Sequence, residues 1–417
     1  FRCLYGGGYA SGLGSDATVT GNTTITTARP VWESNSGVYG GGYAVKSGTA
    51  DVIGTTHITI QKINGQYDYE NANGVFGGGH AVGNYDLVIS NETFKPSQAN
   101  VGSTEITIKK GAVMAPGNTS LHTSIVGGGF VDGNEQSFNN DCPATAKVLG
   151  DVKITIEDNV ALASGFIGGG AVIIQGNASV SGAVNIILGN NCKIVTSENR
   201  NYIGGGYAYN SNNGNSNAIA NVEGDLKASF GNNVMFMESF FAGGYVEIDF
   251  ASEQADVNGN ITYIFGGSAS VRQNYTGNGI IKLEAGKSLS ISGTAAGTTQ
   301  LEIQGSPAKG QVYVTVAKGG SAEFIYTGSN FNLEKEVSGN THTWKLVEAE
   351  IPVNSISGIT EGKEYFKGDT LAFTALGNGM ENNTPSLNNK RWLPSKCLID
   401  TAEINLDSAY SGTINTA

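Results

Sequence analysis

Charged residues, prolines and cysteines are all scarce in this sequence. Lys, Arg, Asp and Glu make up only 14% of its 417 residues, and it has 8 Pro, 4 Cys and 4 His. No apolar run reaches the roughly 18 residues that a membrane-spanning helix needs. Strong helix formers are sparse among many glycines, which argues against an all-α fold. The formal net charge of −12 argues against nucleic acid or an anionic membrane as the main partner.

The few cysteines and histidines also argue against several kinds of metal site and active site. The cysteines form no CxxC pair and no zinc-ligand spacing, so we predict that all are unpaired: Cys3, Cys142, Cys192 and Cys397. No histidine lies in an HExxH motif and no GxSxG motif occurs, which disfavours a zinc hydrolase and a serine hydrolase. The sequence therefore predicts no metal site, no cofactor and no catalytic residue.

Glycine, in contrast, is abundant, with 61 residues, and much of it comes in triplets flanked by apolar residues. Complete triplets begin at Gly6, Gly40, Gly77, Gly127, Gly168 and Gly204, and degenerate copies lie at Ala242 and Gly266. A second motif, Ala-x-Val-x-Gly before an alternating apolar stretch, interleaves with the triplets. Its copies begin at Ala17, Ala50, Ala99, Ala146, Ala178, Ala220 and Ala255, and the copy at Ala99 is one residue short. Two interleaved motifs identify a repeat protein.

Each repeat supplies three short β segments: Ala-x-Val, the Ile-Thr-Ile-like run, and the apolar pair before the glycines. These segments alternate with period two and are rich in β-branched residues. Because one repeat cannot bury its own apolar face, the repeats should stack. We therefore predict an all-β fold whose main part is a right-handed parallel β-helix of seven or more coils, a pectin-lyase-like solenoid.

Three regions are expected along the chain. Residues 1–285 should form the parallel β-helix, and residues 286–349 should form its cap or a small β segment. Residues 350–417 have the alternation and turn spacing of an Ig-like β-sandwich module.

These motifs resemble those of a known class of proteins. GGGYA followed by AxVxGxxxITI resembles the β-helical regions of large surface proteins of gut Firmicutes and Bacteroidetes. The segment ISGITEGKEYFKGDTLAFTALGNGMENNTP, with KRWLPSK after it, resembles a small Ig-like module of Gram-positive wall-anchored proteins. The resemblance implies an exported, adhesin-like protein at the cell surface. Its sorting motif is absent here, so we expect anchoring to the wall through segments outside this sequence.

A carbohydrate-active enzyme is the main alternative, because parallel β-helices often carry polysaccharide lyases and glycosidases. Such sites need carboxylates gathered on neighbouring coils. The candidate pairs are Asp68 with Glu70, Asp86 with Glu92, and Asp132 with Glu135. None recurs at one register on adjacent coils, so we predict solvated surface charges and no enzymatic activity.

The residues that flank the glycine triplets are the best candidates for a binding site. Residues four apart on an extended strand lie on one face, so stacked coils should form two aromatic-rich ladders beside a floor of glycine. Outward-facing ladders would form a trough for sugar rings or extended peptides, whereas inward-facing ladders would be core packing. The candidate ligand-binding residues are Tyr9, Tyr39, Tyr43, Tyr207 and Tyr245.

The sequence thus predicts a non-catalytic, extracellular, adhesin-like protein that binds a glycan or a host or matrix protein. A carbohydrate-active β-helix enzyme and a passive surface stalk stay open as alternatives. No oligomeric state follows from the sequence.

Overall fold

The computed structural model divides into two compact units, Phe1–Val347 and Glu348–Ala417. It describes residues 3–27, 37–61, 74–83, 96–114, 124–132, 144–162, 165–194, 201–209, 217–247, 253–328, 331–348, 353–357, 370–377 and 409–413. The described residues contain strands and no helix, and hence no helix that could cross a membrane.

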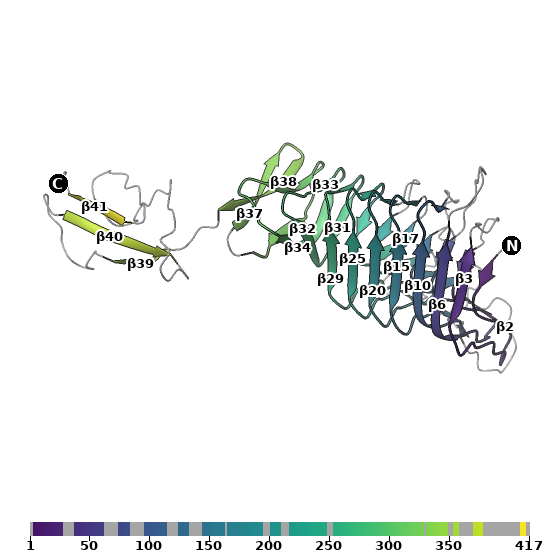
Figure 1. Ribbon diagram of the computed structural model, residues 1–417. Coiled ribbons are helices and arrows are strands. Elements are labelled where there is room, and N and C mark those ends of the chain that lie inside the picture. Colours follow the sequence, from purple (N-terminus) through teal and green to yellow (C-terminus); the bar gives the residue numbers. More distant parts are fainter. Residues whose placement is uncertain are drawn as a thin grey trace. The chain divides into compact units, whose positions relative to one another are not determined.

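The first unit is a stack of β coils (Figure 1). In each coil the Ile-Thr-Ile-like run forms a strand that pairs in parallel with the equivalent strand of the next coil. We name these strands the Ile-Thr-Ile sheet: β3 (Thr23–Thr27), β6 (Val52–Ile60), β10 (Val101–Ile108), β15 (Val152–Ile156), β20 (Val184–Leu188), β25 (Leu226–Phe230), β29 (Ile261–Phe265), β32 (Ile280–Glu284), β34 (Ala295–Gln304) and β36 (Glu323–Tyr326). The predicted all-β fold with a parallel β-helix is confirmed.

Two further parallel sheets lie on either side of the glycine triplets. The pre-glycine sheet contains β1 (Leu4–Tyr5), β4 (Gly37–Tyr39), β7 (Gly74–Phe76), β12 (Ile125–Val126), β17 (Phe166–Ile167), β22 (Tyr202–Ile203), β27 (Phe240–Phe241), β31 (Tyr275–Gly277) and part of β34. The post-glycine sheet contains β2 (Tyr9–Ser11), β5 (Tyr43–Val45), β8 (His80–Val82), β13 (Phe130–Asp132), β18 (Ala171–Ile173), β23 (Tyr207–Tyr209) and β28 (Tyr245–Glu247). The apolar pairs before the glycines therefore form strands, as predicted.

Two sheets complete the coil walls, and their short strands within residues 1–285 were not expected from the sequence. A return sheet, β9 (Ser97–Gln98), β14 (Ala144–Thr145), β19 (Gly176–Asn177) and β24 (Ala218–Ile219), precedes the Ala-x-Val segment. A fifth sheet follows the Ile-Thr-Ile strand: β11 (Val113–Met114), β16 (Ala161–Leu162), β21 (Lys193–Ile194), β26 (Met235–Phe236), β30 (Ala269–Val271), β33 (Leu289–Ile291), β35 (Val312–Val316), β38 (Thr341–Glu348) and β37 (Phe331–Ser338). The return strands and the first four strands of the fifth sheet have two residues each, too short for a periodic pattern to reveal.

The valines of the Ala-x-Val motif stack in register, as the repeat predicts. Val148, Val180 and Val222 form successive parallel bridges from coil to coil. The copy that begins at Ala99 is one residue short, and the pairing of β6 with β10 shows a register shift after Val101. The missing residue is therefore absorbed by a local irregularity, and the following Ile-Thr-Ile strands stay aligned.

The interior has a wide lobe and a narrow lobe with different side chains. The wide lobe holds large apolar residues of the Ile-Thr-Ile, pre-glycine and fifth sheets, such as Ile186 and Tyr202. The narrow lobe lies between the post-glycine strands and the returning chain, and alanines dominate it, among them Ala44 and Ala50. Small side chains let two backbone walls approach closely, so alanine determines the width of the narrow lobe.

The glycine triplets form the neck between the two lobes. A Cβ on Gly42 would lie 2.2 Å from the carbonyl oxygen of Ala50, and one on Gly41 would lie 2.7 Å from the backbone nitrogen of Gly79 in the next coil. Glycine is thus required because backbone approaches backbone, both within a coil and between coils. At Gly204 a side chain of the Ile-Thr-Ile sheet also needs this room, because the nearest atom to an added Cβ would be the Tyr263 hydroxyl oxygen.

The coils shorten once the triplets stop. After β29 the chain goes through β30, β31 and β32 with no post-glycine or return strand, so the narrow lobe ends. The stack finishes where β35 pairs in parallel with β33 on one side and antiparallel with β38 on the other. This antiparallel pairing covers the edge that another coil would otherwise extend.

The second unit contains three described strands, β39 (Val353–Ser357), β40 (Thr370–Gly377) and β41 (Ala409–Thr413). They form an antiparallel sheet in the order β39, β40, β41. The Ig-like fold of residues 350–417 and the boundaries of the three predicted regions stay predictions.

Candidate ligand-binding site

The flanking residues of the glycine triplets lie on the outer side of the coil wall. Along β4, Val38 belongs to the wide interior lobe, whereas the next residue, Tyr39, belongs to a separate apolar cluster. Consecutive residues of a strand point to opposite faces. We call this separate group the outer cluster, and its buried members are Tyr39, Phe76, Val126, Phe130, Ile167, Ala171, Ile203 and Tyr207.

Rings of the two predicted ladders contact one another in the outer cluster. Tyr39 stacks along its own ladder on Phe76, with ring centroids 4.6 Å apart. It also stacks on His80 of the other ladder at 4.9 Å. The corner at the glycines therefore brings the two ladders together, and their own rings fill the space that the sequence suggested as a trough. The ladders are outward-facing, yet their central members are buried.

Burial differs widely among the five candidate tyrosines. Tyr39 is 1% exposed and Tyr207 is 7% exposed, whereas Tyr9 is 64% exposed. Tyr43 and Tyr245 are half-buried. A ligand can therefore reach Tyr9 and Tyr43 at the first coils and Tyr245 at the last post-glycine strand, while Tyr39 and Tyr207 support the rings around them.

Phenols of this cluster ionise only with difficulty. Burial raises the pKa of Tyr39 and of Tyr43. Burial also raises the pKa of Tyr207, and the hydrogen bond that its hydroxyl donates to Glu247 Oε2 raises it further. The outer cluster is thus a neutral, hydrogen-bonding aromatic surface at physiological pH.

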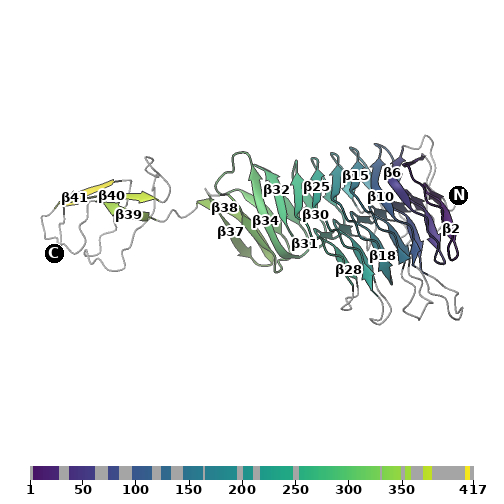
Figure 2. The same ribbon diagram turned by 90° about the horizontal axis from the view of Figure 1, so that it is seen from below.

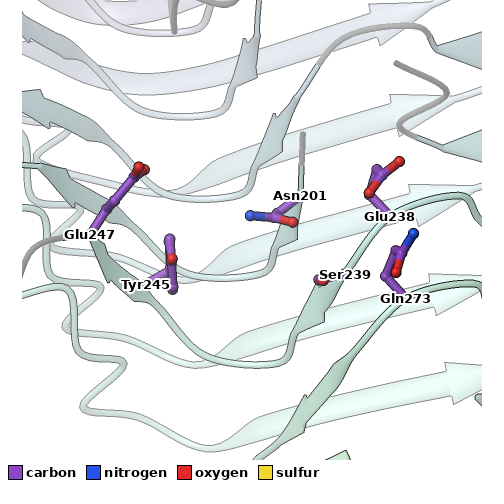
Figure 3. Close-up of a pocket in the computed structure, with 6 residues that line it drawn as sticks. All are labelled: Asn201, Glu238, Ser239, Tyr245, Glu247 and Gln273. Atoms are coloured by element: carbon purple, nitrogen blue, oxygen red, sulfur yellow. The ribbon is translucent and has the colours of Figure 1, made fainter. Parts of the chain in front are cut away.

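An open pocket of about 390 Å³ lies where the post-glycine sheet ends. Figure 3 shows Tyr245 and Glu247 on one side of it, Glu238 and Gln273 on the other, and Asn201 and Ser239 between them. Its volume is within the range of small-molecule sites.

The end of the narrow lobe explains why a pocket forms at this place. Tyr245 and Glu247 belong to β28, the last post-glycine strand, whereas Ser239 and Gln273 precede pre-glycine strands of successive coils. Figure 2 shows β28 at the end of its sheet, where the coils become narrow. The outer cluster finishes at the contact of Phe241 with Tyr245, whose ring centroids are 4.3 Å apart.

The pocket combines one aromatic ring with hydrogen-bonding side chains. Burial raises the pKa of the Tyr245 phenol, and the nearby Glu247 carboxylate raises it further. Amides from Asn201 and Gln273 supply donors and acceptors, and the carboxylates of Glu238 and Glu247 supply acceptors. This composition suits a ligand with many hydroxyl groups and an apolar face, such as a sugar.

Of the pocket residues, the sequence predicted only Tyr245. Glu247 could have been found, because it lies two positions after Tyr245 on the same strand and hence on the same outer face. Asn201, Glu238, Ser239 and Gln273 occupy positions where the repeat shows no pattern, so no sequence signal indicated them.

The other residues considered for chemistry are dispersed. Asp132 lies on β13, away from the pocket lining, and the remaining candidate carboxylates lie outside the described residues: Asp68, Glu70, Asp86, Glu92 and Glu135. His57 Nδ1 lies 3.1 Å from Glu105 Oε2 on the Ile-Thr-Ile sheet. In the described parts of the chain, no group of three or more His, Cys, Asp or Glu residues could hold a metal ion.

Two of the four cysteines can be compared with the prediction. Cys3 and Cys192 are thiols and belong to no disulfide, as expected, and Cys192 is buried. Cys142 and Cys397 lie outside the described residues.

Neither a family model nor a curated protein matches the chain in comparisons with known proteins. The geometry of the site and the character of the repeats therefore carry the evidence for function.

Proposed function

We propose that this protein is a non-catalytic, adhesin-like protein of a bacterial cell surface, and that its β-helix binds a glycan. The observation that carries the proposal is the pocket at the end of the outer cluster, in which the Tyr245 ring lies among carboxylate, amide and hydroxyl groups. Aromatic rings stack on the apolar faces of sugars, and the polar groups satisfy the sugar hydroxyls. The resemblance of the repeats to bacterial surface proteins supports an extracellular location and wall anchoring.

The first experiment measures retention and cleavage together. The protein is incubated with plant polysaccharides, mucin glycans and matrix proteins, and both bound material and new reducing or unsaturated ends are scored. Retention of a glycan without new ends supports the proposal. Retention of a matrix protein alone would mean that the ligand is a protein and not a glycan. If neither binding nor cleavage is detected, a passive stalk would be favoured.

Tyr245→Ala and Tyr9→Ala form a matched pair for placing the site. Both tyrosines flank a glycine triplet in the post-glycine sheet, at its opposite ends, and neither is buried. We expect Tyr245→Ala to weaken glycan binding about tenfold or more, as loss of a stacking ring does, and Tyr9→Ala to leave it unchanged. The reverse result would move the site to the first coils.

A carbohydrate-active enzyme is the second candidate, because Glu238 and Glu247 line the same pocket. Two carboxylates flanking one bound sugar are the minimum that glycoside hydrolysis needs. Release of cleaved product that is abolished in Glu238→Gln or Glu247→Gln would establish this function in place of the first.

A further inference from the structure

The charge of the pocket lining indicates which saccharides it accepts. Two of the six lining side chains are carboxylates, Glu238 and Glu247, and the other four are uncharged. No Lys, Arg or His is among these six described residues. An anionic sugar would place a second negative charge beside the Glu247 carboxylate, which is unfavourable.

Glu247 is held in place by a neutral partner. The buried Tyr207 hydroxyl donates a hydrogen bond to Glu247 Oε2 from the preceding post-glycine strand. Because the Tyr207 phenol is uncharged, its hydrogen bond orients the Glu247 carboxylate without neutralising its negative charge. Among the described residues, no ion pair involves Glu247. Of its two oxygens, the described residues engage only Oε2, which leaves Oε1 for a hydrogen-bond donor from the pocket.

The Tyr245 ring lies beside this carboxylate on the same strand. The two residues are separated by one position on β28, so both project from its outer face. Burial raises the pKa of the Tyr245 phenol, and the nearby Glu247 carboxylate raises it further. A carboxylate next to an aromatic ring offers an ion pair and a cation–π contact to one ammonium group.

We propose that the pocket binds a saccharide unit carrying a protonated amine, with Glu247 as the specificity-determining residue. This inference rests on the proposed glycan-binding function and names its ligand class. In the bound state the amine donates to Glu247, the sugar ring packs on Tyr245, and the amides of Asn201 and Gln273 bind hydroxyl groups. A uronate or other acidic sugar is rejected.

The test is calorimetric titration of the full chain with four tetramers at mildly acidic pH and low ionic strength. They are the tetramers of glucosamine, N-acetylglucosamine, galacturonic acid and lysine. We expect the glucosamine tetramer to bind about threefold to tenfold more tightly than the N-acetyl tetramer, because exposed charge-assisted contacts have modest strength. The galacturonic acid tetramer should show no binding, and added salt should reduce the preference for the amine.

Two variants distinguish the effect of the Glu247 charge from that of the overall negative charge of the protein. Glu247→Gln keeps the shape of the side chain and removes its charge, so it should reduce the ratio of the affinities for the glucosamine and N-acetylglucosamine tetramers to about one. Glu323→Gln, which removes an exposed carboxylate on β36 away from the pocket lining, is the control and should change neither affinity. Equal melting temperatures would show that both variants are folded.

Each other outcome overturns the inference in a distinguishable way. Equal affinity for the amine and N-acetyl tetramers, or a preference that survives in Glu247→Gln, removes the assigned role of the charge but leaves glycan binding intact. Binding of the lysine tetramer without the glucosamine tetramer makes the ligand a basic peptide. If none of the four tetramers binds but the panel of polysaccharides and mucin glycans contains a retained glycan, only the proposed ligand class is wrong. If no member of that panel binds either, the proposed function itself is refuted.

Discussion

Ile186 and Ile187 follow one another on β20 and lie on opposite sides of the coil wall. Ile186 is 1% exposed and belongs to the wide interior lobe, whereas Ile187 is 44% exposed. In successive coils the residues paired with Ile186 are Ile154 and Ala228, and those paired with Ile187 are Thr155 and Ser229. The strand alternation thus separates an apolar inner column from a largely polar outer one.

This pair allows a direct test of the coil wall. We expect Ile186→Ala to lower the free energy of unfolding by about 2–5 kcal/mol, because it leaves a cavity in a packed interior. Ile187→Ala should change it by only about 0.5 kcal/mol, because that side chain already contacts solvent. Urea unfolding followed by circular dichroism measures both. Equal losses in the two variants would show that the wall does not have the inner and outer faces described.

A second prediction concerns the spacing of coils at the glycine triplets. A Cβ on Gly205 would lie 2.7 Å from Val257 Cγ2 and 2.8 Å from the backbone nitrogen of Gly244. A Cβ on the equivalent Gly243 would meet nothing closer than 3.7 Å. In the next coil Asn278 follows β31 at this position, and the degenerate copy predicted at Gly266 lies after β29 and not in the neck. Gly205→Ala should therefore destabilise the protein by about 1–3 kcal/mol, as overpacking does.

Gly243→Ala is the matched control for this substitution. It should lie within about 0.5 kcal/mol of the parent, or be slightly stabilising because it restricts the unfolded chain. Thermal unfolding of the two variants side by side provides the comparison. A larger loss for Gly243→Ala than for Gly205→Ala would contradict the packing of the triplets against the following coil.

The parallel β-helix could be predicted from sequence because its determinants repeat. Each coil returns an Ala-x-Val segment and an apolar pair to the same register, and a column such as Val148, Val180 and Val222 then follows from stacking alone. The narrow lobe was missed because its return strands have only two residues each, and because the recurring alanines do not by themselves reveal that two walls lie close together. That the two ring ladders contact each other at the glycine corner could not be predicted either, because this contact depends on the path of the chain in the folded coil.

The candidate site was predicted only in part, for a related reason. Tyr245 belongs to the repeat and was identified, but the pocket beside it exists because the post-glycine sheet ends at β28. An end of a repeat is a departure from the pattern, so its lining residues have no equivalents in other coils. Glu238 and Gln273, for example, line the same pocket as Tyr245 only because consecutive coils of different width stack there.

A third prediction concerns the asparagine ladder at one turn. Asn191 has a φ of 56°, and its Nδ2 donates to Asn159 Oδ1 at 3.1 Å, while Asn233 Nδ2 donates to Asn191 Oδ1 at 3.1 Å. Asn191→Ala loses both contacts and places a residue poorly suited to a left-handed conformation there. We expect a loss of about 1–3 kcal/mol from these two effects.

Asn191→Gly separates the two contributions. Glycine accepts the positive φ without strain but makes no ladder contact, so its loss should be about 1 kcal/mol smaller than that of alanine. Chemical denaturation of both variants measures the difference. If glycine proves as costly as alanine or costlier, the hydrogen bonds of the ladder, and not the backbone conformation, are what asparagine provides.

The fourth prediction follows from the phenols buried in the β-helix. Burial raises the pKa of Tyr202, Tyr263 and Tyr275 above the value of 10.0 for an unperturbed phenol. Their folded-state pKa values exceed those in the unfolded chain, so the stability that they contribute is fully present below about pH 10 and is lost as pH rises above it. Each such phenol should lower the free energy of unfolding by about 1.4 kcal/mol per pH unit beyond that point.

Tyr275→Phe tests this linkage with one phenol removed. The Tyr275 hydroxyl lies 3.0 Å from Thr299 Oγ1, so the variant should lose about 1 kcal/mol at neutral pH. Above pH 10 its free energy of unfolding should then fall less steeply than that of the parent, by about 1.4 kcal/mol per pH unit. Urea unfolding at a series of pH values gives both slopes. Parallel slopes would mean that Tyr275 ionises equally easily in the folded and the unfolded chain, which its complete burial beside Phe240 and Phe324 does not allow.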